Sequence, residues 1–134
     1  MIQDDARTVM RLDDDLIGWL TTVDPQGQPQ TSAVWFLREG DELLIYSRPH
    51  ATRLRNLATN PRIAFNLRGD AAGDSVMTLE GIAAVEPGAA TPIDVGPYMA
   101  KYGSEIERLG WTHTSFDEDF PVAVRIRVTR MRAW

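Results

Sequence analysis

The sequence contains no cysteine, which removes several kinds of site at once. Without thiols the chain forms no disulfide, no thiolate-ligated metal centre and no cysteine nucleophile. Histidine is almost as scarce, because only His50 and His113 occur and they lie far apart in the chain. There is no Gly-x-Ser-x-Gly motif and no histidine pair at metal-ligand spacing. We therefore assign no catalytic side chain and expect no metal site.

Long apolar runs are also missing, since none approaches the roughly 20 residues that a membrane-spanning helix needs. The N-terminal segment carries Asp4, Asp5 and Asp13 to Asp15, the opposite of a basic secretory leader. We expect a cytoplasmic protein that does not contact a membrane. At 134 residues the chain is predicted to form one domain, residues 1–134.

Lysine is nearly absent, and the charge is unevenly distributed. The formal net charge is −5, yet residues 48–68 carry five arginines and no carboxylate, so this stretch is +5 and the remainder is −10. An anionic surface opposes general nucleic-acid binding, so we expect no nucleic-acid partner. A small anion bound locally at the cationic stretch is compatible with this charge distribution.

Apolar periodicity and turn residues predict a mainly β protein with short helices. Strands are expected over residues 16–23, 30–37, 42–47, 62–67, 76–85 and 121–131. Helices are expected over residues 2–12, 51–59 and 98–109, and irregular loops over 69–74 and 110–120. Gly81 indicates a bulge or a close backbone approach within its strand. Six short antiparallel strands favour a small barrel over a parallel α/β fold.

The segment 46–57 runs from a strand end into the start of a helix, where free N–H groups favour an anion. Its further hydrogen-bond donors are Ser47, Thr52, Arg53, Arg55 and Asn56. A phosphate site is one interpretation. The other is a solvated helix face with Leu54 and Leu57 in the core, and the residues alone do not separate the two.

Two further clusters are ambiguous. In the pair Trp35-Phe36, one side chain is expected to pack inward while the other can line a pocket for a flat ring. The run Asp117 to Asp119 lacks the ligand spacing of a calcium loop and is interpreted as a solvated acidic loop.

Four short motifs occur in an order that is typical of one superfamily. They are Trp19 to Pro29 (WLTTVDPQGQP), Ser32 to Phe36 (SAVWF), Tyr46-Ser47 with Arg53 to Leu57 (RLRNL), and Asn60 to Ile63 (NPRI). Together they resemble the pyridoxamine 5'-phosphate oxidase-like split β-barrel superfamily. More narrowly, they resemble its flavin/deazaflavin oxidoreductases of the B type, the coenzyme F420-dependent enzymes of actinobacteria.

The resemblance implies a six-stranded antiparallel, FMN-binding-like split β-barrel that forms a homodimer with cofactor sites at the interface. It implies that Ser32, Ala33, Val34, Trp35 and Phe36 hold the deazaflavin ring. It also implies that Ser47, Arg53, Arg55 and Asn56 bind the phosphate and the start of the anionic tail. The family often has proline where Ala33 stands and lysine where Arg53 stands, and the second difference changes the donor geometry.

The implied function is an oxidoreductase in which coenzyme F420 exchanges a hydride with a small, apolar, conjugated acceptor. In such enzymes the cofactor performs the chemistry while the protein orients it and excludes water. Trp35 is then expected to be a pocket wall, and Tyr98, Trp111 and His113 are candidates for the acceptor side. The several negative charges of a glutamylated deazaflavin suit the cationic stretch better than FMN does.

Two alternatives remain open from the sequence. One is an FMN-dependent oxidoreductase of the pyridoxamine-phosphate-oxidase-like type, which would use the same barrel and phosphate site. The other is a protein that binds F420 or haem without turnover, with His50 or His113 as the available histidine ligands for haem.

Overall fold

The structure is a computed structural model, and it describes residues 2–3 and 5–134. Asp4, one of the acidic residues expected near the N-terminus, lies outside the described residues, as does Met1. The helices are α1 (Ala6–Asp14), α2 (Thr52–Thr59), α3 (Gly96–Arg108) and α4 (His113–Asp119), with a 3₁₀ turn η1 (Pro92–Asp94). The strands are β1 (Gly18–Val23), β2 (Pro29–Val34), β3 (Leu37–Glu39), β4 (Glu42–Ser47), β5 (Arg62–Leu67), β6 (Met77–Val85) and β7 (Val122–Ala133). Within the described ranges, no helix is long and apolar enough to cross a membrane.

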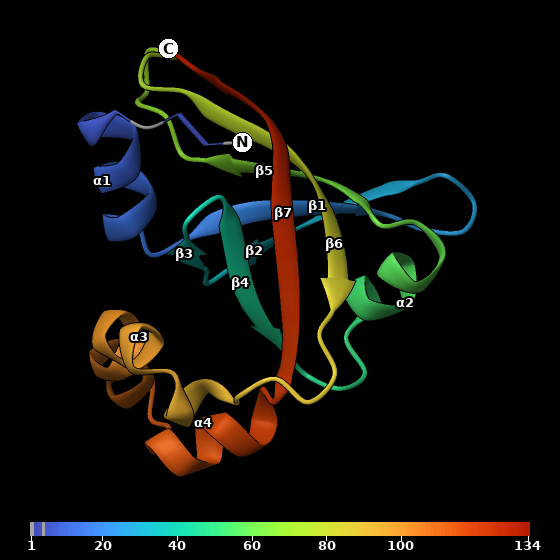
Figure 1. Cartoon of the computed structure of the whole chain (residues 1–134), viewed down its shortest axis with the longest axis vertical. Coiled ribbons are helices and arrows are strands. Elements are labelled where there is room, and N and C mark those ends of the chain that lie inside the picture. Colours follow the sequence, from blue (N-terminus) through green and yellow to red (C-terminus); the bar gives the residue numbers. More distant parts are fainter. Residues whose placement is uncertain (1, 4) are drawn as a thin grey trace.

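The seven strands form one curled sheet in the order β2-β1-β5-β6-β7-β4-β3, and every neighbouring pair is antiparallel. Its two edge strands, β2 and β3, are consecutive in the chain and are separated only by Trp35 and Phe36. Two residues cannot bridge the edges of a flat seven-stranded sheet, since neighbouring strands lie about 4.8 Å apart. The sheet therefore curls on itself as a partly closed barrel (Figure 1).

The prediction of a single strand over residues 30–37 is wrong. The structure divides this segment into β2 and β3, which is why the sheet has seven strands instead of six. Val34 is the last residue paired to β1, and Leu37 is the first paired to β4. Between them the hydroxyl of Tyr102, on α3, accepts a hydrogen bond of 2.8 Å from the Phe36 amide. The same hydroxyl lies 3.0 Å from the Phe36 carbonyl oxygen. The Tyr102 side chain on α3 thus forms a hydrogen bond with the backbone at Phe36, where the chain passes from one edge of the sheet to the other.

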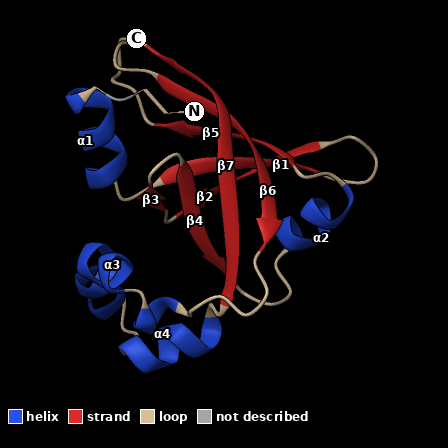
Figure 2. Cartoon of the chain, viewed as in Figure 1, coloured by secondary structure: helices blue, strands red, loops and turns tan. Residues whose placement is uncertain are grey.

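Two apolar clusters lie on opposite faces of the sheet. One fills the barrel and includes Leu20, Leu43, Phe65 and Ile126. The other lies between the outer face of β4 and the helices α3 and α4, which Figure 2 shows together beside one end of β4 and β7. Side chains alternate along a strand, so Leu43 and Ile45 point into the barrel while Leu44 and Tyr46 point towards these helices.

Other boundaries confirm or correct the predictions. Strands β4 and β5 have the predicted bounds, and the register between β6 and β7 shifts at Glu80/Gly81 as the glycine indicated. A Cβ at Gly81 would lie 2.7 Å from the Arg127 carbonyl oxygen, so a larger residue would clash with the backbone at this position. The first helix begins at Ala6 rather than Ile2, with Asp5 as its N-cap.

The loop predicted over residues 110–120 is also wrong, because it contains α4. A reciprocal capping box starts this helix: the Thr112 hydroxyl accepts from the Ser115 amide, and the Ser115 hydroxyl accepts from the Thr112 amide. The acidic run is therefore helical. Asp117 accepts a hydrogen bond from the Ile93 amide, and Asp119 accepts one from the Trp111 indole.

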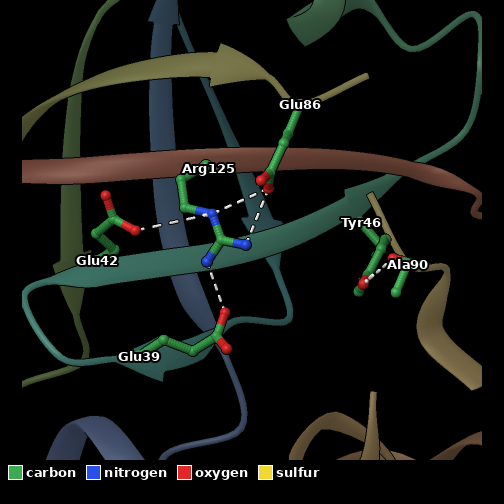
Figure 3. Close-up of polar contacts among 6 residues, drawn as sticks. All are labelled: Glu39, Glu42, Tyr46, Glu86, Ala90 and Arg125. Carbon is green, nitrogen blue, oxygen red and sulfur yellow. Dashed lines mark hydrogen bonds and ion pairs between the residues drawn. The ribbon is translucent and has the colours of Figure 1, made fainter. Parts of the chain in front are cut away.

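Arg125 on β7 connects the segment that follows β6 to the sheet through hydrogen bonds to glutamate side chains (Figure 3). Its guanidinium lies 2.9 Å from Glu86, 2.6 Å from Glu39 and 3.8 Å from Glu42. Nearby, the Tyr46 hydroxyl donates to the Ala90 carbonyl at 2.6 Å (Figure 3). These contacts fix the chain between β6 and α3, and hence the position of α3 over β4.

Candidate functional site

Arg53, in the first turn of α2, is a half-buried cation between two strands. Its guanidinium donates to the Ser47 hydroxyl at 3.0 Å and to the Ser32 hydroxyl at 3.2 Å. Within residues 2–3 and 5–134 no carboxylate forms an ion pair with it. Burial lowers the pKa of Arg53, and no neighbouring anion offsets this shift. The guanidinium is thus partly desolvated and has no carboxylate counter-ion among the described residues.

A polar groove of about 430 Å³ opens beside this guanidinium. It is lined by Thr22, Gln30, Thr31, Ser32, Ala51, Thr52, Arg53 and Asn56. The residue before α2, Ala51, provides no side-chain cap, so the first N–H groups of the helix lack the usual side-chain acceptor. Hydroxyls, amides, a guanidinium and an uncapped helix start make this groove suitable for a phosphate.

Asn56 fastens α2 to the sheet. Its buried side-chain nitrogen donates to the Thr22 hydroxyl at 2.9 Å and to the Gln30 side-chain oxygen at 2.8 Å. Both amide hydrogens are used in these contacts. Asn56 lines the groove, but its amide donors position α2 rather than point at a ligand.

An aromatic pocket of about 270 Å³ lies on the other side of Arg53. Its lining residues are Ala33, Val34, Trp35, Tyr46, Arg53, Tyr98, Leu109, Trp111, Phe116 and Phe120. Trp35 stacks on Tyr102 with ring centroids 4.7 Å apart and lies 5.5 Å from Phe116. Flat rings dominate the walls, so the pocket suits a planar apolar group. Arg53 lines both cavities and joins the polar site to the apolar one.

The structure brings most of the predicted site residues together. Ser32, Arg53 and Asn56 line the polar groove, while Ala33, Val34 and Trp35 line the aromatic pocket. Ser47 is buried and accepts from Arg53. Of the Trp35-Phe36 pair, Trp35 faces the pocket, and Phe36 is fully buried in the barrel against Phe65.

Arg55 is exposed and lines neither cavity. Its guanidinium donates to the His50 carbonyl and to the Thr52 hydroxyl, both at 3.2 Å. The other arginines of the cationic stretch do not form one cluster either. Arg48 stacks over the Phe120 ring at 4.5 Å, whereas Arg62 and Arg68 are exposed at opposite ends of β5.

Of the candidates in the late segment, Tyr98 and Trp111 line the aromatic pocket. His113 does not; its Nε2 lies 3.3 Å from a Glu107 oxygen, between α3 and α4. Sequence reasoning missed Tyr46, Leu109, Phe116 and Phe120 in the pocket and Thr22, Gln30 and Thr31 in the groove. The register of the β1–β2 hairpin is a signal that could have found groove residues, because it pairs Thr22 with Gln30 and Leu20 with Ser32.

Comparisons with known proteins agree with this fold. The model of the pyridoxamine 5'-phosphate oxidase family matches residues 4–134. No curated protein matched the chain in a separate search.

Three of the similar solved structures illustrate the range of relatives. The conserved hypothetical protein Rv2991 from Mycobacterium tuberculosis is 25% identical, with a TM-score of 0.73 over 99% of this chain and 86% of that one. A protein described as an F420 reductase is 24% identical, with a TM-score of 0.69 over 92% and 94%. The haem storage protein HutZ from Vibrio cholerae is 18% identical, with a TM-score of 0.66 over 96% and 93%.

These likenesses support the split-barrel fold, and their stated functions differ from one another. The family match spans nearly the whole chain, including every strand of the sheet and both cavities beside Arg53. This chain therefore belongs to the pyridoxamine 5'-phosphate oxidase family.

Proposed function

We propose that this protein is an oxidoreductase that binds coenzyme F420 and transfers a hydride between it and a small conjugated acceptor. The observation that carries the proposal is Arg53, a half-buried cation without a carboxylate partner in the described chain. It stands between a polar groove and an aromatic pocket. A ligand that joins an anionic group to a flat ring fits here with the anion in the polar groove and the ring at the border of the aromatic pocket beside Arg53, which leaves the interior of the pocket for the acceptor.

The residues present fit such a coenzyme. The Arg53 guanidinium, the Ser32 hydroxyl and the uncapped start of α2 would hold the phosphate in the polar groove. The backbone of β2 at Ala33 and Val34, with Trp35 beyond it, would hold the ring. When bound, the deazaflavin supplies the hydride chemistry. The chain contributes orientation, a cation for the phosphate and apolar walls that exclude water.

Charge favours the deazaflavin coenzyme over FMN. Besides Arg53, Arg48 and Arg55 flank the start of α2 and are exposed. They are available to the additional carboxylates of a glutamylated tail, which FMN lacks. Arg62 begins β5 and Arg68 directly follows that strand, and neither lines the groove or the pocket, so they are not included in this site.

We further propose that the protein is a homodimer with shared cofactor sites. Trp19 on β1 is 42% exposed, and it is paired in register with Ala33, which lines the aromatic pocket. An exposed tryptophan beside a ligand pocket is suited to cover by a second copy.

A haem is not assigned to either cavity. Neither His50 nor His113 lines the aromatic pocket or the polar groove, so an axial histidine ligand is missing there.

The proposal is tested by parallel fluorescence titrations of the purified protein with coenzyme F420 and with FMN. We expect F420 to bind more tightly, and the difference to shrink with added salt because the extra contacts are exposed charges. Reduced F420 should then be oxidised by a conjugated ketone only when the protein is present. Tighter binding of FMN would transfer the assignment to an FMN enzyme, and binding of neither would refute the proposed function.

A further inference from the structure

The aromatic pocket contains a buried polar group that the cofactor site does not use. Among the lining side chains, the Tyr46 hydroxyl donates to Ala90 and the Trp111 indole donates to Asp119. The Tyr98 hydroxyl has no hydrogen-bond partner within the described residues, 2–3 and 5–134. The Trp35 indole N–H also lacks one there, but its side chain is only partly buried and reaches water.

Tyr98 differs because the residue is only 1% exposed. Its ring is held edge-on by Tyr46 at 5.0 Å and tilted against Tyr102 at 5.0 Å. The hydroxyl is nevertheless not sealed into the core. Among the described residues, the Tyr98 hydroxyl oxygen is not one of the side-chain atoms that are fully buried and make no hydrogen bond. The small accessible part of Tyr98 therefore includes its hydroxyl, which opens into the cavity that the residue lines.

A buried hydroxyl without a partner carries a desolvation cost, which an acceptor atom inside the cavity would relieve. Burial raises the pKa of Tyr98 far above its ordinary value, and Tyr102 and Tyr46 add to the shift. The hydroxyl thus keeps its proton and acts as a hydrogen-bond donor.

The side chains that line the aromatic pocket indicate the shape and charge of the rest of the ligand. The aromatic side chains of Trp35, Phe116 and Phe120 line the cavity, and Phe116 and Phe120 stack on each other at 4.6 Å. Among the described residues that line the pocket there is no carboxylate, and the one cation, Arg53, is at the border with the polar groove. A flat, uncharged, conjugated body with a single acceptor oxygen matches these surfaces.

We propose that the Tyr98 hydroxyl donates a hydrogen bond to the oxygen of a planar conjugated carbonyl compound bound in the aromatic pocket, and so selects the acceptor. This inference rests on the proposed function, because it names the acceptor class for the same hydride transfer. A donor at this oxygen stabilises the negative charge that develops there when a hydride reaches the conjugated carbon.

The test is isothermal titration calorimetry of the protein, without coenzyme and saturated with F420, using two matched probes. 2-Acetylnaphthalene has the carbonyl oxygen, and 2-ethylnaphthalene has nearly the same shape without it. Wild-type protein should prefer the ketone. Tyr98→Phe should weaken ketone binding about tenfold, roughly 1.4 kcal/mol, and leave the hydrocarbon unchanged.

Tyr46→Phe is the matched control, because its hydroxyl lies on the same wall but is bonded to Ala90. It should leave the preference for the ketone intact. The melting temperature of Tyr98→Phe should equal or exceed that of the wild type, since the variant removes an unpartnered hydroxyl. A fall in melting temperature would mean that the hydroxyl has a structural partner and would overturn the proposal.

The proposal is also overturned if Tyr98→Phe leaves ketone affinity unchanged, or weakens both probes equally. It fails as well if neither probe binds the wild type in either state. The affinity for F420 is measured on the same samples. It distinguishes a failure of the Tyr98 proposal from a failure of the proposed function. Tyr98→Phe should leave F420 affinity unchanged, whereas a wild type that does not bind F420 contradicts the proposed function, whatever the probes do.

Discussion

Lys101, the single lysine of the chain, shows how one residue combines charge with burial. Its ammonium donates to the Phe36 carbonyl at 2.9 Å and to the Leu12 carbonyl at 3.3 Å, and it lies 4.0 Å from the centroid of the Phe36 ring. Burial lowers the pKa of Lys101 to about 8, although Asp13, Asp14 and Asp15 at the end of α1 partly oppose the shift.

This lowered pKa predicts a pH dependence of stability. Between pH 8 and the ordinary pKa of 10.5, the unfolded chain holds more protons at Lys101 than the folded chain does. The contribution of Lys101 to the free energy of unfolding therefore rises as pH increases through this window. Urea denaturation at several pH values should show wild type gaining stability relative to Lys101→Met from pH 8 to pH 10. A difference that stays constant or shrinks would contradict this prediction.

Single residues of the site were predictable where local sequence decides their position. Ser32, Trp35 and Arg53 belong to a strand end and a helix start, and both cavities are formed around them. Tyr46, Phe116 and Phe120 could not be assigned to the pocket in this way, because helix packing over β4 brings them there.

At the scale of elements, the junction between β2 and β3 depends on α3. The Tyr102 hydroxyl accepts from the Phe36 amide at 2.8 Å and donates to the Leu16 carbonyl at 2.7 Å. One buried oxygen thus joins the end of β2, the segment before β1, and α3. This junction also sets the orientation of Trp35, which stacks on the Tyr102 ring.

Tyr102→Phe keeps the ring but leaves the Phe36 amide without this acceptor. We expect the free energy of unfolding to fall by about 1–3 kcal/mol, because a buried donor loses its partner. Urea denaturation monitored by tryptophan fluorescence measures this, with Tyr98→Phe as the control, since its hydroxyl has no partner among the described residues. Equal stability of wild type and Tyr102→Phe would show that the junction does not need the hydroxyl.

Elements with strong local signals were predicted correctly, and those that depend on distant contacts were not. Strands β4 and β5 are bounded by turn residues and have the predicted limits. The break at Trp35-Phe36 depends on Tyr102, 66 residues away from Phe36. Helix α4 has seven residues, and its N-terminal signal is the Thr112–Ser115 pair rather than a threonine followed by glutamate.

For the whole molecule, we expect two copies to associate through the face that bears Trp19. Replacing it with glutamate would place a charge in that interface at a position that is 42% exposed in the single chain. Light scattering during size-exclusion chromatography should show the wild type as a dimer and Trp19→Glu as a monomer. Ile93 on η1, which is also 42% exposed and lines neither cavity, provides the control, and Ile93→Glu should remain dimeric. A monomeric wild type would refute the dimer proposal.

The measurement that tests the central claim most directly is the F420 affinity of Arg53→Met compared with that of Arg62→Met. Both variants remove one arginine from the same cationic stretch, but only Arg53 lies between the two cavities. Loss of a charge-assisted phosphate contact should cost about 1.5–3 kcal/mol, or roughly ten- to a hundredfold in affinity.

Arg62→Met should bind F420 as the wild type does, and Arg53→Lys should fall between wild type and Arg53→Met because it keeps the charge without the forked geometry. Equal affinity of Arg53→Met and Arg62→Met would contradict the assignment of the anion site to Arg53, and with it the proposed function.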